Sequence, residues 1–323
     1  MTCSTWACRP KNWIPYLTTD NANLIYTSMT DQSLYVDKSL CPAAFYYEYV
    51  HKGKPVVIKG ATREWEAFEK WDMNYFWERG GNTILRVKEG NVSQGQFRNV
   101  LMRDYVQQLM DYESSKTKGV QTPLPPYLHD VAIFNLMPNL INDVMPFKSQ
   151  YLPGLYHREW WKYVQFFMSL SGHITPLHFD TLVTHNLFFQ VKGKKKFILI
   201  AREDKKNCYI KGWRWAGVNP SRPDYEQFPN FKNVKPVTVE VDAGDILYMP
   251  PGMLHYVESL SFSISFNIDW HTPKSVLGGA FSVFEGAPRE NFKYNMLLLL
   301  ALWLKLPDRY FFSYYKSYLN YIS

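Results

Sequence analysis

The chain has few cysteines, and their spacing excludes several classes of protein. Four occur in 323 residues: Cys3, Cys8, Cys41 and Cys208. No two are separated by two residues, so the sequence lacks the CxxC pairs of a zinc ribbon or a thioredoxin motif. Three of the cysteines lie near the start of the sequence and the fourth lies far along it, which is unlike the pattern of a disulfide framework. We therefore expect a reduced, cytoplasmic protein.

Long hydrophobic runs are also missing. The most apolar run spans Met296 to Leu304, nine residues with Lys293 and Lys305 near its ends. A membrane-spanning helix needs about 18 or more. The first 15 residues contain no apolar stretch typical of a secretory signal. We expect no membrane partner, and the run is better explained as a buried helix or a contact between subunits.

Neither sign of charge dominates the chain. Thirty-six Lys and Arg against 29 Asp and Glu leave a net charge of +7, and the charges are mostly interspersed. A nucleic-acid-binding protein usually concentrates its basic residues, so nucleic acid stays an unsupported partner. Aromatic residues make up 17% of the chain and charged residues 20%, which excludes a disordered protein. No heptad or Gly-X-Y period is present, which excludes a coiled coil or collagen.

From about Trp160 onward, short apolar segments alternate with turns such as Pro250-Pro251-Gly252. Many short strands separated by turns predict a β-sandwich or barrel. Helical patterns precede it, including one predicted over residues 97–111, and others follow it. We predict one continuous, mainly β domain with flanking helices, in three parts: an N-terminal helix and strand frame over 1–159, a β core over 160–272 and a C-terminal helical segment over 273–323.

The segment GHITPLHFD, residues 172–180, carries the most specific chemistry. His178 and Asp180 are two residues apart, so on a strand they project from the same face. An imidazole and a carboxylate supply two of the three ligands of a facial triad, which leaves three positions on iron open. His255 follows a strand and a tight turn that could return it beside His178 as the third ligand. For the bare triplet, the competing explanation is a polar pair satisfied within a sheet.

The other histidines have weaker patterns. His185 lies close to the triplet and could reach the site, although a structural role is favoured. We expect His51 on a solvated helix face. No partner spacing distinguishes His129, His157, His173 or His271.

Four blocks of sequence, taken in order, resemble the JmjC/cupin-like family of Fe(II)- and 2-oxoglutarate-dependent oxygenases, in particular the asparaginyl hydroxylase that acts on hypoxia-inducible factor. They are residues 52–71, SGHITPLHFD at 171–180, NLFFQVKGKKKFIL at 186–199 and DAGDILYMPPGMLHYVESL at 242–260. The resemblance covers most of the chain. It implies a double-stranded β-helix, or jelly roll, for the β core, with Fe(II), 2-oxoglutarate and molecular oxygen as cofactors and co-substrates.

The resemblance also implies roles for individual residues. His178, Asp180 and His255 would bind the iron, and Lys195 and Thr175 would bind the distal carboxylate of 2-oxoglutarate. Three further residues would lie near the co-substrate: Tyr127, Asn186 and Asn267. The alternative for Lys195 is a solvated turn with its neighbouring lysines, although strand alternation requires only two of those four lysines to face outward. The Asp180–Asn186 spacing is two residues longer than in the asparaginyl hydroxylase pattern, so the choice of substrate is not inherited.

The activity implied by the resemblance is hydroxylation, and demethylation is the same chemistry on an N-methyl carbon. We expect a protein or peptide side chain as the substrate. The alternatives are a small metabolite or modified RNA base, and a non-catalytic cupin-type binding module. The complete triad and Lys195 argue against the last of these. The apolar segment 291–322 is expected to pack on the barrel or to form a homodimer contact.

Overall fold

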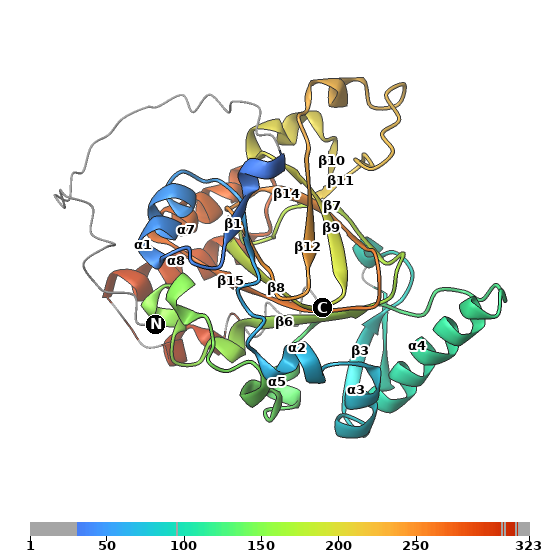
Figure 1. Cartoon of the computed structure of the whole chain (residues 1–323). Helices are drawn as coiled ribbons and strands as arrows, with labels where there is room; N and C mark the ends of the chain where they lie inside the picture. The colour runs from blue at the N-terminus through green and yellow to red at the C-terminus, as the bar shows by residue number, and fades with distance from the viewer. Residues whose placement is uncertain (1–30, 95, 305, 307, 314, 316–323) are drawn as a thin grey trace.

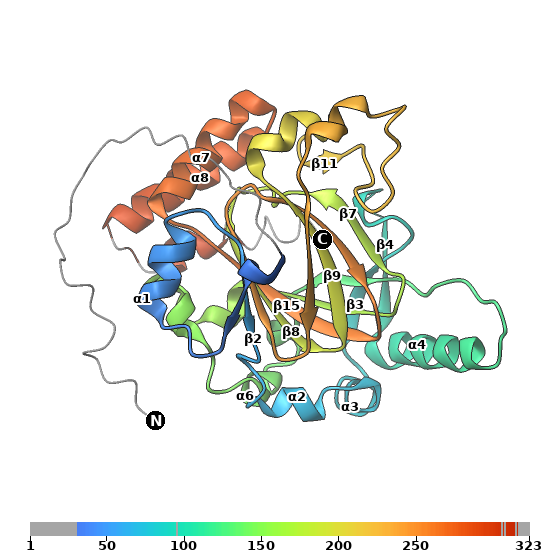
Figure 2. The same ribbon diagram turned by 45° about the horizontal axis from the view of Figure 1, so that its top comes forward.

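The computed structural model describes residues 31–315, apart from 95, 305, 307 and 314. Cys3, Cys8 and the end of the predicted segment 291–322 lie outside the described residues. Two β-sheets face each other, and helices pack around them (Figures 1 and 2).

The larger sheet has seven strands, and every neighbouring pair is antiparallel except β1 and β2. In spatial order they are β1 Tyr35–Asp37, β2 Val56–Lys59, β13 Ile246–Met249, β8 His185–Lys192, β15 Ser263–Trp270, β6 Val164–Ser169 and β5 Leu128–Val131.

The smaller sheet has six antiparallel strands. In spatial order they are β10 Ile210–Lys211, β11 Trp215–Ala216, β7 Ile174–His178, β14 Leu254–Ser259, β9 Lys194–Ile200 and β12 Val237–Asp242. A separate hairpin joins β3 Ile84–Lys88 to β4 Phe97–Leu101. Two facing, mostly antiparallel sheets with helices around them confirm the predicted mainly β jelly roll.

The helices are mostly short. They are α1 Pro42–Phe45, continued as one π-helical segment Tyr46–Val50, then α2 Glu66–Lys70, α3 Met73–Arg79, α4 Met102–Thr117, α5 Ile133–Leu136, α6 Leu140–Asp143, α7 Pro273–Phe281 and α8 Arg289–Leu304. The predicted helix over 97–111 is wrong in its first five residues, because Phe97–Leu101 alternates in exposure and pairs with β3. Within the described residues, no helix has both the length and the apolar character needed to cross a membrane.

Strand alternation separates two apolar cores. On β8, Leu187 and Phe189 point outward into a core shared with the helices, whereas Phe188 points into the space between the sheets. The same alternation on β15 sends apolar side chains outward. It leaves a row of buried polar side chains facing the pocket side: Ser265, Asn267 and Asp269. The interior of the barrel is therefore polar at one end, which is where the candidate site lies.

Candidate active site

A bulge in β7 brings two predicted site residues onto one face. In the pairing with β14, Thr175 lies opposite Val257 and His178 lies opposite His255. Between these two pairs, two residues of β7, Pro176 and Leu177, face one residue of β14, Tyr256. An extra residue of this kind re-aims the side chains that follow it. As a result both Thr175 and His178 line the same pocket.

The three predicted metal ligands converge. Ligand atoms of His178, Asp180 and His255 all lie within 4.8 Å of one another, and His255 Nε2 is 3.9 Å from Asp180 Oδ1. The predicted return of His255 beside His178 is therefore what the structure shows. One part of the reasoning was wrong, because β7 ends at His178 and Asp180 lies in the loop beyond the strand.

Both imidazoles are held in the orientation that a metal ligand requires. His178 Nδ1 donates to the Pro176 carbonyl at 2.8 Å, and His255 Nδ1 donates to the Met253 carbonyl at 3.2 Å. This leaves each Nε2 unprotonated and directed to the site. Burial, followed by the nearby His255 and Arg214, lowers the pKa of His178 well below its ordinary value. A neutral imidazole is the form that binds a metal.

Lys195 is a buried lysine on β9 with hydroxyl partners. It is 1% exposed, and its Nζ donates to Tyr127 Oη at 3.1 Å and to Ser265 Oγ at 3.0 Å. Burial lowers its pKa to about 7. In the described part of the chain, no carboxylate lies within ion-pair distance of it. Buried lysines are rare unless they are paired, so this one indicates an anionic ligand.

The neighbouring lysines follow the predicted alternation. Lys194 forms ion pairs with Glu240 and Asp242 at 3.0 Å, and Lys196 pairs with Glu258 at 2.5 Å. These two side chains point away from the pocket that Lys195 enters. Lys194 and Lys196 are therefore the solvated lysines of the turn, and Lys195 is the lysine that enters the pocket.

Around Thr175 the structure reveals a charged cluster that sequence reasoning missed. Thr175 Oγ1 lies 3.3 Å from His129 Nε2, and His129 Nδ1 lies 2.8 Å from Asp130 Oδ2. Lys88, 3% exposed, lies 3.3 Å from the same carboxylate oxygen. Burial lowers the pKa of His129 to about 4. Asp130 has a left-handed backbone, with φ of 62°, which is uncommon outside glycine and frequent at functional sites.

Asn186 and Asn267 both donate to Asp269, a residue that the sequence analysis did not identify. Asn186 Nδ2 donates to Asp180 Oδ2 at 3.2 Å and to Asp269 Oδ1 at 3.0 Å, and Asn267 Nδ2 donates to that Oδ1 at 2.9 Å. Burial and the nearby Asp180 raise the pKa of Asp269 well above its ordinary value. The network holds Asp180 Oδ2, which leaves Oδ1 on the side of His255. The period-2 pattern of polar residues on β15 was the signal for Asp269.

The longer spacing after Asp180 is absorbed by a tight loop. Val183 donates its N–H to the Asp180 carbonyl at 2.9 Å and has a φ of 58°. Trp213 Nε1 and Asn291 Nδ2 both donate to the Thr181 carbonyl, at 3.2 and 2.9 Å. Asn186 therefore reaches Asp180 despite the two extra residues.

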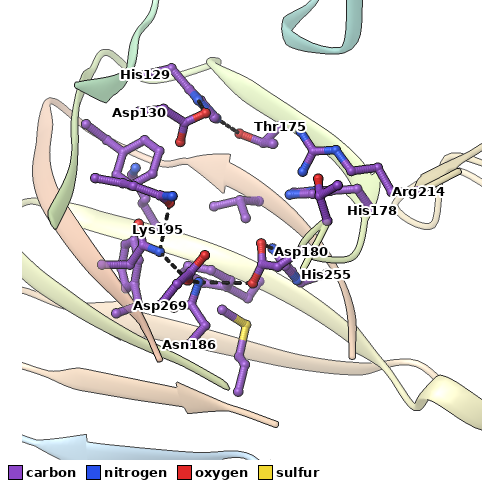
Figure 3. Close-up of a pocket in the computed structure, with 18 of the residues that line it drawn as sticks. His129, Asp130, Thr175, His178, Asp180, Asn186, Lys195, Arg214, His255 and Asp269 are labelled. Atoms are coloured by element: carbon purple, nitrogen blue, oxygen red, sulfur yellow. Dashed lines mark hydrogen bonds and ion pairs between the residues drawn. The ribbon is translucent and has the colours of Figure 1, made fainter. Parts of the chain in front are cut away.

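Arg214 also lines the pocket, beside His178 (Figure 3). Its guanidinium carbon lies 4.5 Å from the centroid of the Trp215 ring, and that ring packs against the His178 ring at 4.7 Å. By contrast, His185 lies outside the pocket. Its nitrogens contact Tyr248 Oη and Thr272 Oγ1, so it has the structural role that was favoured.

The pocket has two chemically different ends. Figure 3 shows Lys195 on one side of the pocket and His178, Asp180 and His255 on the other. Two neutral imidazoles and one carboxylate fit a divalent metal such as Fe(II). A buried ammonium with hydroxyl partners fits a carboxylate. The residues present therefore fit both the iron and a dicarboxylate co-substrate.

Comparison with known proteins gives a consistent result. The model of the family described as "Cupin-like domain" matches residues 42–275. "JmjC domain-containing protein D" of Dictyostelium discoideum is 29% identical over 68% of this chain, which spans 52% of that protein. Human "tRNA wybutosine-synthesizing protein 5" is 29% identical over 68% of this chain and 72% of its own length. Human "Bifunctional peptidase and (3S)-lysyl hydroxylase JMJD7" is 22% identical over 73% of this chain and 83% of its own length. The chain thus spans about half the length of the first of these relatives.

Proposed function

Because the chain belongs to the JmjC/cupin-like family of Fe(II)- and 2-oxoglutarate-dependent oxygenases, we propose that it is a dioxygenase that hydroxylates a C–H bond in a side chain of a protein or peptide. One observation carries the proposal. Lys195 is buried without a carboxylate partner among the described residues. It lies across one pocket from a convergent His, Asp, His set. A metal ion that carries a dicarboxylate would bind the His, Asp, His set at one end of the pocket and Lys195 at the other.

The residues have distinct tasks in this proposal. His178, Asp180 and His255 hold Fe(II), and the Pro176 and Met253 carbonyls keep the two imidazoles in the binding tautomer. Lys195 binds the distal carboxylate of 2-oxoglutarate, with Tyr127 holding its ammonium in place. Iron with 2-oxoglutarate and oxygen supplies the oxidising power for a C–H bond.

The remaining pocket residues orient the two charged ends. Thr175 presents a hydroxyl on the same wall as Tyr127, and Asn186 fixes one oxygen of Asp180. Phe167, Phe188 and Phe197 line the inner wall. This apolar wall excludes water and strengthens the contact between Lys195 and a carboxylate, because charge pairs are stronger where the dielectric constant is low.

The activities named for two of the similar proteins support two substrate classes. The lysyl hydroxylase supports a protein side chain, and the tRNA wybutosine-synthesizing proteins support a modified RNA base. We propose the protein side chain, and the RNA base or a small metabolite is the second candidate. A non-catalytic binding module is the least supported, because the pocket combines a complete His, Asp, His set with Lys195.

The test is anaerobic titration with Fe(II) and 2-oxoglutarate. We expect a visible absorption band that needs both ligands, and we expect its loss in Asp180→Ala and in Lys195→Met. His185→Gln is the matched control, because His185 is an equally buried polar side chain outside the pocket. No band in the wild type, or a band that survives in Asp180→Ala, would refute the oxygenase proposal.

We also propose that the C-terminal helices form a homodimer contact. Along α7, the turn after it and α8, a row of large apolar side chains is exposed: Leu277, Phe281, Phe284, Phe292, Met296, Leu300, Trp303 and Leu304. Trp303 is 78% exposed and Phe284 85%. Large apolar side chains exposed in such number on neighbouring helices are typical of a protein contact.

A further inference from the structure

A groove lies beside the pocket and shares Tyr127 with it. It is lined in part by Tyr127, His173, Ile174, Lys211, Trp215 and Tyr256. Tyr127 also lines the metal pocket, and Trp215 packs against His178. Among the described residues that line the groove, none is acidic. A substrate that reaches the metal through this groove therefore meets no negative charge from its walls.

Arg214 lines the pocket, and the residue after it, Trp215, lines the groove. The short hairpin of β10 and β11 presents Arg214, with the turn made at Gly212, whose φ is 62°. The Arg214 carbonyl accepts from the Phe179 N–H at 3.4 Å. The guanidinium stacks over Trp215 at 4.5 Å, so its orientation is set before any ligand binds.

No carboxylate lies within ion-pair distance of this guanidinium in the part of the chain that the structure describes, although its charge helps to lower the pKa of Asp130. Asp130 already faces His129 and Lys88. Asp269 accepts two asparagine amides, and Asp180 belongs to the metal set. No dashed line reaches Arg214 in Figure 3. A fixed guanidinium without an ion-pair partner at a pocket wall is suited to bind a carboxylate or phosphate in a bidentate manner.

The aromatic rings of the groove favour a peptide over a nucleobase. Base recognition uses a free aromatic face for stacking. Trp215 has the His178 ring on one side at 4.7 Å and Arg214 at 4.5 Å. Tyr127 is stacked on His173 at 5.0 Å and contacts the Lys195 ammonium at 5.6 Å. Each of these two rings already stacks on a neighbouring histidine and contacts a cation.

The groove also presents a strand edge. β11 pairs with β7 at one position, Trp215 opposite His178. Among the named strands, Ile174–Leu177 therefore has a neighbour only on the β14 side, and Ile174 is 40% exposed. An extended peptide can lie along such an edge.

We propose that Arg214 binds the side-chain carboxylate of an acidic residue in a peptide substrate, close to the residue that is oxidised. This inference rests on the proposed oxygenase function and adds its substrate class. Arg214 is a specificity residue in this proposal. It selects acidic peptides and sets their position relative to the metal.

The test compares peptide pools within each variant. Three synthetic pools are used: one rich in Asp and Glu, one in which Asn and Gln replace them, and one rich in Lys and Arg. A pool of single-stranded RNA is added. Oxygen incorporation by mass spectrometry and succinate release give kcat/KM. We expect the wild type to prefer the acidic pool over the amide pool about tenfold. Arg214→Glu should reverse the order in favour of the basic pool, and Arg214→Lys should keep part of the acidic preference.

Arg86→Gln is the matched control. Arg86 also stacks on an aromatic ring, at 4.2 Å over Phe97, and lies on β3 outside both pockets. It should keep the wild-type order of pools. A variant that folds less well lowers all rates without reversing that order, so the comparison is independent of stability.

Two results would overturn the inference: a wild type without an acidic preference, or an Arg214→Glu variant that keeps the wild-type order. Turnover of RNA instead of peptide would also overturn it. The absorption band with Fe(II) and 2-oxoglutarate is recorded on the same wild-type preparation. An absent band refutes the oxygenase function, whereas a band without an acidic preference refutes only the role of Arg214.

Discussion

Replacing Lys195 with methionine should make the ligand-free protein more stable and abolish binding of 2-oxoglutarate. Methionine has a similar length and carries no charge. The ammonium of Lys195 is fully buried with two hydroxyl partners and no carboxylate among the described residues. Lys195→Met should therefore remove a destabilising group from the folded state together with its binding partner for the co-substrate.

The size of the effect follows from the pKa of Lys195. Burial lowers it from 10.5 to about 7, and at about 1.4 kcal/mol per unit this is an unfavourable contribution of about 5 kcal/mol. The two hydrogen bonds lost from a charged donor offset about 3 kcal/mol of it. A net gain of about 2 kcal/mol in the free energy of unfolding remains. Because the folded-state pKa lies below the unfolded-state value, the gain is largest below about pH 7 and declines as the pH approaches 10.5.

Urea unfolding at neutral pH under anaerobic conditions, with Fe(II) present throughout and with or without saturating 2-oxoglutarate, measures both effects. The wild type should be stabilised by about 2.7 kcal/mol at a ligand concentration of 100 Kd, and Lys195→Met should not respond. If Lys195→Met is less stable than the wild type without ligand, or is still stabilised by 2-oxoglutarate, the assignment of Lys195 is wrong.

Three further predictions follow from the same contacts. The Kd for 2-oxoglutarate should rise about tenfold per pH unit above about pH 7, because Lys195 loses its proton there; calorimetry should show a flat profile in Lys195→Arg, and a flat wild-type profile would contradict the reasoning. Asp269→Asn should change the free energy of unfolding by less than about 1 kcal/mol, whereas Asp269→Leu removes one of two acceptors from each of two buried amides and should cost about 2–4 kcal/mol in chemical denaturation; equal effects would argue against a neutral carboxyl. Trp303→Ser combined with Leu300→Ser should halve the mass measured by sedimentation; an unchanged mass would remove the dimer proposal.

The sequence was sufficient for the fold class and for the convergence of His178 with His255, because alternating strands and a tight turn have local signatures. Strand alternation predicted that only some of the lysines at 192–196 face outward, and the resemblance identified Lys195 as the one in the pocket. Alternation depends on residues that are near one another in the chain, whereas the distant pair His178 and His255 was expected from the order of the motifs.

What could not be predicted depends on contacts between distant segments. The bulge at Pro176 is visible only once β7 is paired with β14. Asp130 and Lys88 are 42 positions apart, and their pairing requires β5 and β3 to be placed. Arg214 looked like one of many basic residues, because its importance comes from the Trp215 and His178 rings that hold it.

The loop after Asp180 shows that the barrel is not a self-contained module. Asn291 on α8 donates to the Thr181 carbonyl, and a Cβ added to Gly279 on α7 would come within 2.8 Å of the Leu182 carbonyl oxygen. The C-terminal helices thus support the segment that carries Asp180, a proposed metal ligand. A chain cut before residue 291 loses the exposed apolar side chains of α8 and the contact from Asn291 together. Truncation therefore cannot separate assembly from activity, whereas point substitutions on the outer face of α8 can. Grafting the barrel into another protein would require α7 and α8 to go with it.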